Sequence, residues 1–185
     1  MADSAVYHDG STSSLNAVHC YITTHSADGK AVFHDPPSGT ELVTPQRVGE
    51  AALNVHYTTN SVPVQVANDR DLTAFYEQPT PVPIALRNGS VLRMVDLAPG
   101  GQSPMHATNS VDYCVVIQGE VILILEDFDS GPRRTMKVGD VSVQRGTSHA
   151  WQNGSSTEWA RMLAVVLDAE IPGREDNSGG IDLPK

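Results

Sequence analysis

Two histidines and an aspartate are the residues of this sequence whose types and spacing are most suited to chemistry. His106 begins a short strand-like run, Asp112 begins the next one, and His149 lies in a third. Two imidazoles and one carboxylate that converge inside a small β-barrel form a facial ligand set for a divalent transition metal, with coordination positions left open. We therefore predict that His106, Asp112 and His149 are both the metal ligands and the catalytic residues.

Neighbours on the same strands should form the wall of this site, because side chains two positions apart in a strand share a face. The wall residues predicted in this way are Thr108, Cys114, Val116 and Trp151. Arg161 is the only cation in the last apolar run, and we predict that it binds an anionic part of the substrate, with a surface ion pair as the alternative. A carboxylate that faces inward, such as Asp112, is costly unless it meets a cation, a metal or a hydrogen-bond donor.

The same residues also permit interpretations without a metal. Both histidines can be hydrogen-bonded barrel residues, and Asp112 can orient His106 as a general acid–base pair. Cys114 can be a small core residue and Trp151 a packing residue. Five further histidines lie in weakly patterned stretches and are expected at the surface or an interface: His8, His19, His25, His34 and His56.

Short runs of β-forming residues position these side chains. The strands predicted from Ser90 onward cover residues 91–97, 112–117, 121–125, 135–138, 141–144, 149–152 and 160–169. Residues 121–125 are continuously apolar, as expected for a strand buried on both faces. Short strands at this spacing, with almost no helical periodicity, indicate an all-β sandwich or barrel.

The first half of the chain is patterned more weakly. Strands are expected at residues 18–24 and 30–34, with an Asp-Gly hairpin turn between them, and at residues 55–62. A short helix is expected from Asp69 to Tyr76, with Asp69 as its N-cap. We divide the chain into a flexible N-terminus (1–16), a β arm and lid segment (17–90), a β-barrel (91–170) and a polar tail (171–185).

The spacing of these residues resembles the two motifs of the cupin superfamily. The first motif reads G-x5-H-x-H-x3-4-E-x6-G, and its positions are occupied here by Gly100, His106, Thr108, Asp112 and Gly119. The second reads G-x5-P-x-G-x2-H-x3-N, and Gly139, Gly146, His149 and Asn153 fit it. In the second motif one residue is missing after the first glycine, and Gln144 stands where proline is usual. The resemblance covers the predicted barrel well and residues 1–85 poorly.

The resemblance implies an all-β, cupin-type barrel (jelly roll) with an N-terminal β arm. At the ligand positions Thr108 replaces a histidine and Asp112 replaces a glutamate, which leaves His106, Asp112 and His149 to hold Zn²⁺, Fe or Mn. We expect an enzyme of small-molecule, secondary metabolism: a non-redox lyase or isomerase acting on a carbonyl-bearing substrate. Two alternatives stay open, an Fe(II) dioxygenase with the same ligands and a barrel that binds a small ligand without catalysis.

Composition limits the partners and the compartment. The net charge of −10 argues against a nucleic-acid partner, and no apolar run is long enough to cross a membrane. Two cysteines are too few for a disulfide framework, and the N-terminus does not read as a signal peptide, so we expect a cytoplasmic protein. Exposed strand edges and the long arm favour a homodimer with strand exchange.

Overall fold

The structure, a computed structural model, describes residues 4–6, 12–37 and 46–174 of the chain. Most of its elements are strands: β1 (Ser4–Val6), β2 (Thr12–Asn16), β3 (Thr23–His25), β4 (Ala31–Phe33), β5 (Gln46–Val48), β6 (Ala51–Thr59), β7 (Ser90–Leu97), β8 (Ser110–Gln118), β9 (Glu120–Leu125), β10 (Arg133–Lys137), β11 (Val141–Arg145), β12 (His149–Asn153) and β13 (Ala160–Asp168). A 3-10 turn (Ala67–Asp69) leads into the helix α1 (Arg70–Tyr76). The prediction of an all-β chain is confirmed.

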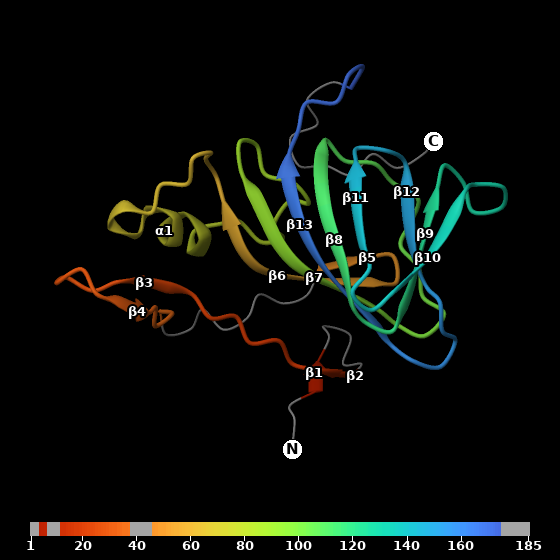
Figure 1. The fold of residues 1–185 in the computed structure, drawn as a ribbon, viewed down its shortest axis with the longest axis horizontal. Coiled ribbons are helices and arrows are strands. Elements are labelled where there is room, and N and C mark those ends of the chain that lie inside the picture. The colour runs from red at the N-terminus through yellow and green to blue at the C-terminus, as the bar shows by residue number, and fades with distance from the viewer. Residues whose placement is uncertain (1–3, 7–11, 38–45, 175–185) are drawn as a thin grey trace.

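Two sheets form the body of the molecule (Figure 1). The larger has the strand order β11-β8-β13-β7-β6-β5 and the smaller the order β10-β9-β12, with every neighbouring pair antiparallel. The seven strands predicted from Ser90 onward are all present, with ends that differ by one or two residues. This strand pattern is what the predicted jelly-roll barrel requires.

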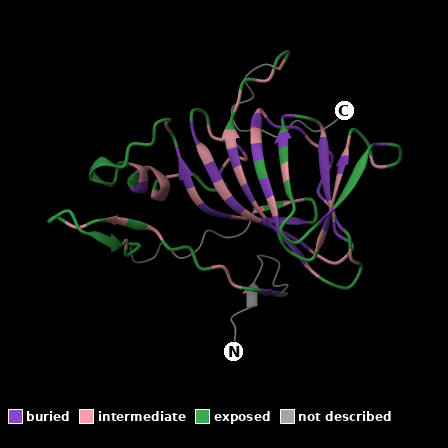
Figure 2. Cartoon of the chain, viewed as in Figure 1, coloured by how far each residue is buried: buried purple, intermediate pink, exposed green. Residues whose placement is uncertain are grey.

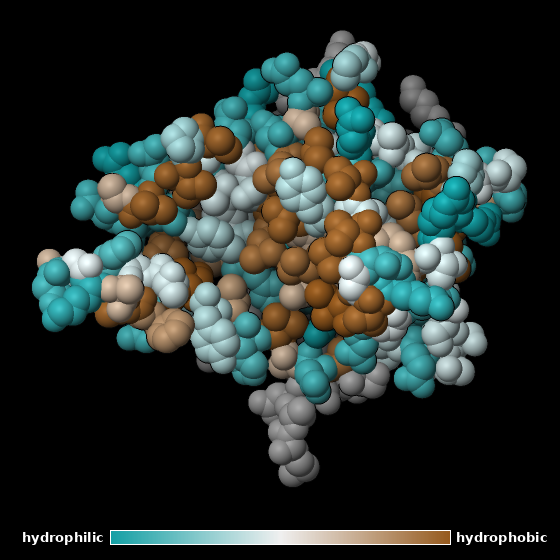
Figure 3. All heavy atoms as spheres, in the orientation of Figure 1, coloured by the Kyte–Doolittle hydropathy of each residue, from teal (hydrophilic) through white to brown (hydrophobic). Residues whose placement is uncertain are grey.

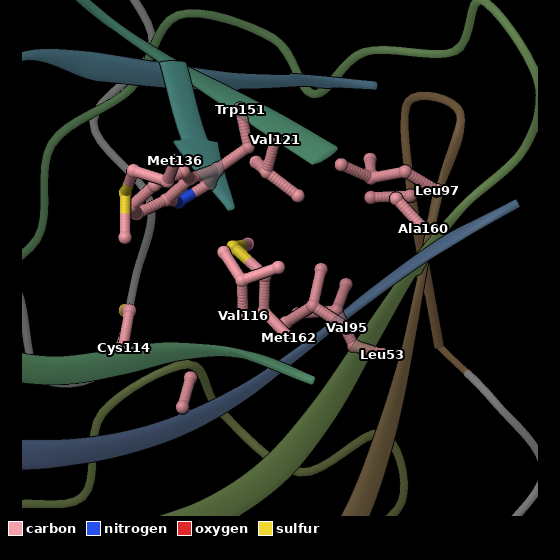
Figure 4. Close-up of a cluster of buried hydrophobic side chains, with 12 residues drawn as sticks. Leu53, Val95, Leu97, Cys114, Val116, Val121, Met136, Trp151, Ala160 and Met162 are labelled. Carbon is pink, nitrogen blue, oxygen red and sulfur yellow. The ribbon is translucent and has the colours of Figure 1, made fainter. Parts of the chain in front are cut away.

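The main core lies between the two sheets (Figure 4). Side chains alternate between faces along each strand, so every second residue of the large sheet points at the small one. Val95, Cys114, Val116 and Met162 come from the large sheet, and Val121, Met136 and Trp151 come from the small sheet. Burial of these apolar side chains is the main force that holds the two sheets together.

Strand β9 was expected to be buried on both faces, and it packs apolar side chains on both faces but is mostly half-buried. Val121 and Leu123 pack in the core between the sheets, whereas Ile122 and Ile124 join a second cluster with Met105 on the opposite face. Only Val121 and Ile124 are fully buried. An uninterrupted apolar run is therefore explained by two separate clusters rather than by one deep core.

The predicted hairpin and helix of the first half are present. Strands β3 and β4 pair across the Asp-Gly turn, and α1 follows directly after Asp69. The predicted capping role of Asp69 is wrong, because this residue has a left-handed backbone and makes no side-chain cap hydrogen bond. Its carboxylate accepts a hydrogen bond from Thr24 instead, at 2.7 Å.

The domain boundaries predicted from the sequence need adjustment. Strands β5 and β6 belong to the large sheet, so the barrel strands begin before residue 91. Within the predicted flexible segment 1–16, β1 and β2 pair with each other and Leu15 is fully buried. Of the predicted tail, residues 171–174 are described and the remainder, like His8, lies outside the described residues.

The outer face of the large sheet is unusually apolar for an exposed surface. Tyr113, Ile117, Val141 and Val143 are exposed on β8 and β11. Figure 3 shows an apolar patch in the middle of the visible face, and Figure 2 shows buried and exposed residues alternating along these strands. A contiguous patch of this kind is typical of an interaction surface, although the homodimer itself stays a prediction.

Arg161 lies on the outer face of the large sheet, opposite to the core. Its Nε and Nη2 atoms donate to the two carboxylate oxygens of Asp96, each at 2.6 Å, and its Nη1 donates to the carbonyl oxygen of Asn16 at 2.7 Å. Both charged side chains are buried. This bidentate pair fixes the N-terminal segment to the sheet.

We predict that Arg161→Met lowers the free energy of unfolding by about 3–5 kcal/mol, because it leaves the buried Asp96 carboxylate without its cation. The double variant Asp96→Leu/Arg161→Met should recover most of this loss, since it removes both buried charges. Urea unfolding of the two variants and the wild type measures the difference. Equal stability of the single variant and the wild type would contradict a structural role for the pair.

Candidate active site

A cavity of about 550 Å³, its opening to solvent included, lies between the sheets. Its polar lining consists of Arg93, Ser103, His106, Thr108, Asp112 and His149. Most of the remaining wall is aliphatic and comes from β5, β6, β7 and β13. A cavity lined mostly by apolar side chains with a few polar groups is typical of a site for a small molecule.

The register of the large sheet places its two charged lining residues on neighbouring rows. In the ladder, Ala164 on β13 lies opposite both Arg93 on β7 and Cys114 on β8. Asp112 precedes Cys114 by two residues on β8, so both side chains lie on the same face, and it pairs with Val166 on β13. Because alternate residues of a strand share a face, all of these side chains point into the cavity.

The two histidines are brought together by the backbone. His106 and His149 exchange both backbone N–H···O hydrogen bonds at 2.8 Å, and their ring centroids lie 4.3 Å apart. The ring of Trp151 packs edge-on against His149. This places two of the three predicted site residues side by side, from a loop and from β12.

His106 has one consistent hydrogen-bonding arrangement. Its Nδ1 lies 2.9 Å from the carbonyl oxygen of Pro104, which can only accept, so Nδ1 carries the proton. The Nε2 atom therefore has a free lone pair. Burial lowers the pKa of His106, so the ring is neutral near pH 7.

His149 is held by Gln144 and Thr147. Its Nδ1 lies 2.6 Å from Gln144 Nε2 and 3.0 Å from the Thr147 carbonyl oxygen. The Gln144 amide also donates to that carbonyl at 2.7 Å and accepts from the Thr147 hydroxyl at 2.9 Å. Burial, and then the nearby His106, lower the pKa of His149 to about 3. Its ring is thus a neutral imidazole with a fixed orientation.

Asp112 is a buried carboxyl group with one oxygen unused by the protein. Its Oδ1 atom is buried and makes no hydrogen bond. Burial raises the pKa of Asp112, while a hydrogen bond from Ser110 and the charge of Arg93 act in the opposite direction. The Ser110 hydroxyl lies 2.6 Å from that of Thr108, so the three side chains form one polar row.

Arg93 is the residue of this cavity that the sequence analysis missed. It is 1% exposed, its Nη2 donates to the carbonyl oxygens of Pro83 and Ile84, and its Nε and Nη1 have no hydrogen-bond partner. Burial lowers the pKa of Arg93 to about 10, which leaves it charged at pH 7. The available signal was its position two residues from Val91 and Val95, on the inward face of a predicted strand.

The predicted wall is present in part. Thr108, Cys114 and Trp151 line the cavity, and burial raises the pKa of the Cys114 thiol to about 12, so it stays protonated. Val116 packs in the core and is absent from the cavity lining. Arg161 is also absent, because the residue next to Met162 points to the other side of the sheet.

Of the remaining histidines that the structure describes, all but His56 are placed as expected. His19 and His25 are exposed, and His34 is half-buried beside the Tyr76 hydroxyl. His56 is 7% exposed, so the prediction that it lies at the surface is wrong. It sits near the buried Arg161–Asp96 pair, and burial lowers its pKa. Asn153 supports a turn, since its amide donates to the carbonyl oxygens of Leu97, Ala98 and Glu158.

The donor chemistry suits a divalent ion. His106 offers a free Nε2 lone pair, and Asp112 has an unpartnered buried oxygen. An Nδ1–H that is donated to a backbone carbonyl oxygen, as in His106, is typical of metal-ligating imidazoles. As the side chains stand, no three His, Cys, Asp or Glu residues in the described ranges lie close enough together to bind one ion. The three-ligand set thus stays a prediction.

Comparisons with known proteins identify the family. A family model described as a cupin domain matches residues 93–166. A "cupin-domain-containing oxidoreductase" of Hypocrea virens is 43% identical over 154 residues, which cover 81% of this chain and 75% of that protein. The chain belongs to the cupin-domain family. The cupin-type fold implied by the two motifs is confirmed.

This cupin is also similar to a "Phomopsin biosynthesis cluster protein C'" of Diaporthe leptostromiformis, 44% identical over 165 residues covering 86% of the chain and 85% of that protein. Among solved structures, a cupin-2 domain from Rhodospirillum rubrum superposes with a TM-score of 0.47 and 14% identity, covering 82% of this chain and 80% of that one. In the described part of the cupin, no helix is both long and apolar enough for a membrane crossing.

We predict a pH dependence of stability that comes from His149. Its pKa is about 3 when folded and about 6.5 in the unfolded chain, so only the unfolded chain takes up this proton between those values. The free energy of unfolding should therefore fall as the pH falls below 6.5, by about 2 kcal/mol from this residue at pH 5. Urea unfolding of chelator-treated protein at pH 7 and 5 measures it.

The loss between pH 7 and pH 5 should be clearly smaller in His149→Gln than in the wild type. His25→Gln, which changes an exposed histidine of β3, should behave like the wild type. If His149→Gln keeps the full pH dependence, the protonation of this ring does not oppose folding.

We also predict that His106→Ala and His149→Ala each lose bound metal while they keep the folded state. Wild-type protein equilibrated with Zn²⁺, Mn²⁺ or anaerobic Fe²⁺ should hold about one equivalent of one of these ions after gel filtration. Thr108→Ala should retain it, because a threonine hydroxyl is a poor ligand for these ions. Elemental analysis and circular dichroism are the measurements. Unchanged metal stoichiometry in His149→Ala would refute the predicted ligand set.

Proposed function

We propose that this cupin is an enzyme of secondary metabolism that catalyses a non-redox reaction on a small carbonyl-bearing molecule: an isomerisation, a dehydration or a decarboxylation. The observation that supports it most is the combination, in one cavity, of a buried carboxyl group with a raised pKa and two neutral imidazoles. A carboxyl group with a raised pKa and an imidazole that is neutral at pH 7 can act as proton donor and proton acceptor in one reaction. The relatives named as biosynthesis cluster proteins support the metabolic context.

The proposed reaction uses His106 as the base. Its Nε2 lone pair can accept a proton from the carbon next to the substrate carbonyl, because its Nδ1–H is already donated to Pro104. Burial raises the pKa of Asp112, and in its protonated form this carboxyl would donate a hydrogen bond to the carbonyl oxygen as negative charge develops there. Return of the proton at another carbon completes an isomerisation, and loss of a neighbouring hydroxyl as water completes a dehydration.

A divalent ion held by His106, Asp112 and His149 would supply Lewis-acid polarisation of the same carbonyl oxygen. With its Nε2 atom bound to the ion, His106 would no longer be the base, so this arrangement is an alternative to the metal-free reaction. Whichever group polarises that oxygen, the aliphatic wall keeps bulk water away from the reacting carbon. Gln144 and Thr147 hold the His149 ring in one orientation beside His106, so this ring forms a fixed part of the site wall. Copies of the chain are proposed to associate as homodimers in the cytoplasm.

The second candidate is an Fe(II)-dependent oxidation. Several relatives, from Hypocrea virens, Aspergillus ruber and Neurospora crassa, are named cupin-domain-containing oxidoreductases. Two histidines and one carboxylate are also the ligand set of non-haem iron oxygenases. This candidate differs from the first in one measurable requirement, the consumption of dioxygen.

We predict that the wild type exchanges carbon-bound hydrogen for deuterium in anaerobic D2O. A panel of small β-keto acids, hydroxy ketones and 1,3-diketones, followed by proton NMR, should include at least one compound that loses its α-hydrogen signal. His106→Gln and Asp112→Asn should slow this exchange by about 100-fold or more, since each removes a proton-transferring group. Asp129→Asn, which neutralises an exposed carboxylate in the β9–β10 loop, is the matched control.

Stoichiometric dioxygen uptake with any compound of the panel, together with no anaerobic turnover, would favour the oxidative candidate and contradict the proposed reaction. Binding of panel compounds with neither exchange nor oxygen uptake would favour the non-catalytic ligand-binding barrel.

A further inference from the structure

Arg93 is a fully buried cation, and only one of its three guanidinium nitrogens has hydrogen-bond acceptors in the protein. One terminal nitrogen, Nη2, donates to the carbonyl oxygens of Pro83 and Ile84, both at 2.9 Å. The Nε and Nη1 atoms are buried and have no partner. Because an unpaired buried donor on a charged group is costly, a group of this kind requires an acceptor that is absent from the protein itself.

The unpartnered nitrogens belong to a residue that lines the cavity. The other charged lining group in the described residues is Asp112, whose charge acts on Arg93 without a hydrogen bond between them. The neighbours of Arg93 in the ladder, Val55 and Ala164, are apolar and offer no acceptor side chain. The acceptor must therefore come from within the cavity.

We propose that the Arg93 guanidinium binds the carboxylate of an anionic ligand in this cavity, which assigns the substrate of the proposed reaction to the small carboxylic acids. The planar guanidinium presents donors in a fixed fork, which matches the two oxygens of a carboxylate. The carbonyl groups of Pro83 and Ile84 hold this fork in place before the ligand arrives, so little entropy is lost on binding.

The remainder of the ligand must be apolar and compact. Around Arg93 the cavity wall consists of Leu53, Ile84, Val95 and Ala164. Asp112 lies on the same sheet as Arg93, two strands away, whereas His149 belongs to the facing sheet and pairs with His106. A ligand that places a carboxylate at Arg93 and a polarisable carbonyl group near the histidines would meet a complementary group at each position. This assignment rests on the proposed function only in placing the substrate in the same cavity.

The test compares benzoate with benzamide, which have nearly the same shape and differ in charge. Isothermal titration calorimetry at pH 7 should show that the wild type binds benzoate at least about tenfold more tightly than benzamide. Arg93→Met should abolish this preference. Asp112→Asn should strengthen benzoate binding and so widen the preference for benzoate, because it removes the one acidic side chain of the described lining, whose charge competes with the ligand for Arg93.

Controls separate the cavity cation from general charge and from misfolding. Arg145→Met removes an exposed arginine of β11 and should keep the preference of the wild type. Arg93→Lys keeps the charge without the fork and should lose most of the preference while it retains a folded state by circular dichroism. If Arg93→Met does not fold, the wild-type comparison and Asp112→Asn decide the question. Equal affinity of the wild type for benzoate and benzamide, or unchanged selectivity in a folded Arg93→Met, would overturn the proposal.

These results are independent of turnover. A benzoate preference without hydrogen exchange in any compound refutes the proposed reaction and leaves the anion site standing. Hydrogen exchange in neutral compounds, combined with equal binding of benzoate and benzamide, refutes the anion site alone.

Discussion

The site depends on charged and polar side chains being held on the inner face of a sheet that is otherwise apolar. Sheet register fixes where these groups stand: Arg93 and Asp112 on two strands separated by β13, with only small or aliphatic side chains between them. Burial of each of these polar groups costs free energy, and in the low dielectric of the cavity each interacts strongly with a ligand that supplies a complementary group. The neutral imidazoles, the raised pKa of Asp112 and the open donors of Arg93 all follow from this constraint.

Much of this arrangement could be predicted from the sequence, because local patterns determine it. The spacing from Gly100 to Gly119 and from Gly139 to Asn153 identified the family and the histidines that line the cavity. Alternation along β8 placed Asp112 and Cys114 inside and Tyr113 outside, where it is 46% exposed. The apolar run in β9 and the Asp-Gly hairpin were equally local signals.

The features that were missed depend on contacts between distant parts of the chain. Arg93 and Arg161 both lie in predicted strands, yet one faces the cavity and the other meets Asp96, which lies 65 positions away. Alternation within β7 gives Arg93 the inward face of Val91 and Val95, but only the pairing of β7 with β13 shows that Arg161 meets Asp96. His56 looked like a surface residue because nothing in its own segment indicates that the N-terminal segment and the Arg161–Asp96 pair surround it. Asp69 has the right position for a cap, but its left-handed backbone turns the carboxylate towards Thr24.

Gln144 gives this cupin a control over proton position that a proline at the same place would not provide. With the amide nitrogen donating to His149 Nδ1, the ring carries its proton on Nε2; with Nδ1–H donating to Thr147, Nε2 becomes a lone pair. Rotating the Gln144 amide by about 180° would thus change His149 Nε2 from a protonated hydrogen-bond donor to an atom with a free lone pair that can bind a metal. The orientation of the Gln144 amide and the tautomer of His149 are therefore coupled through one hydrogen bond.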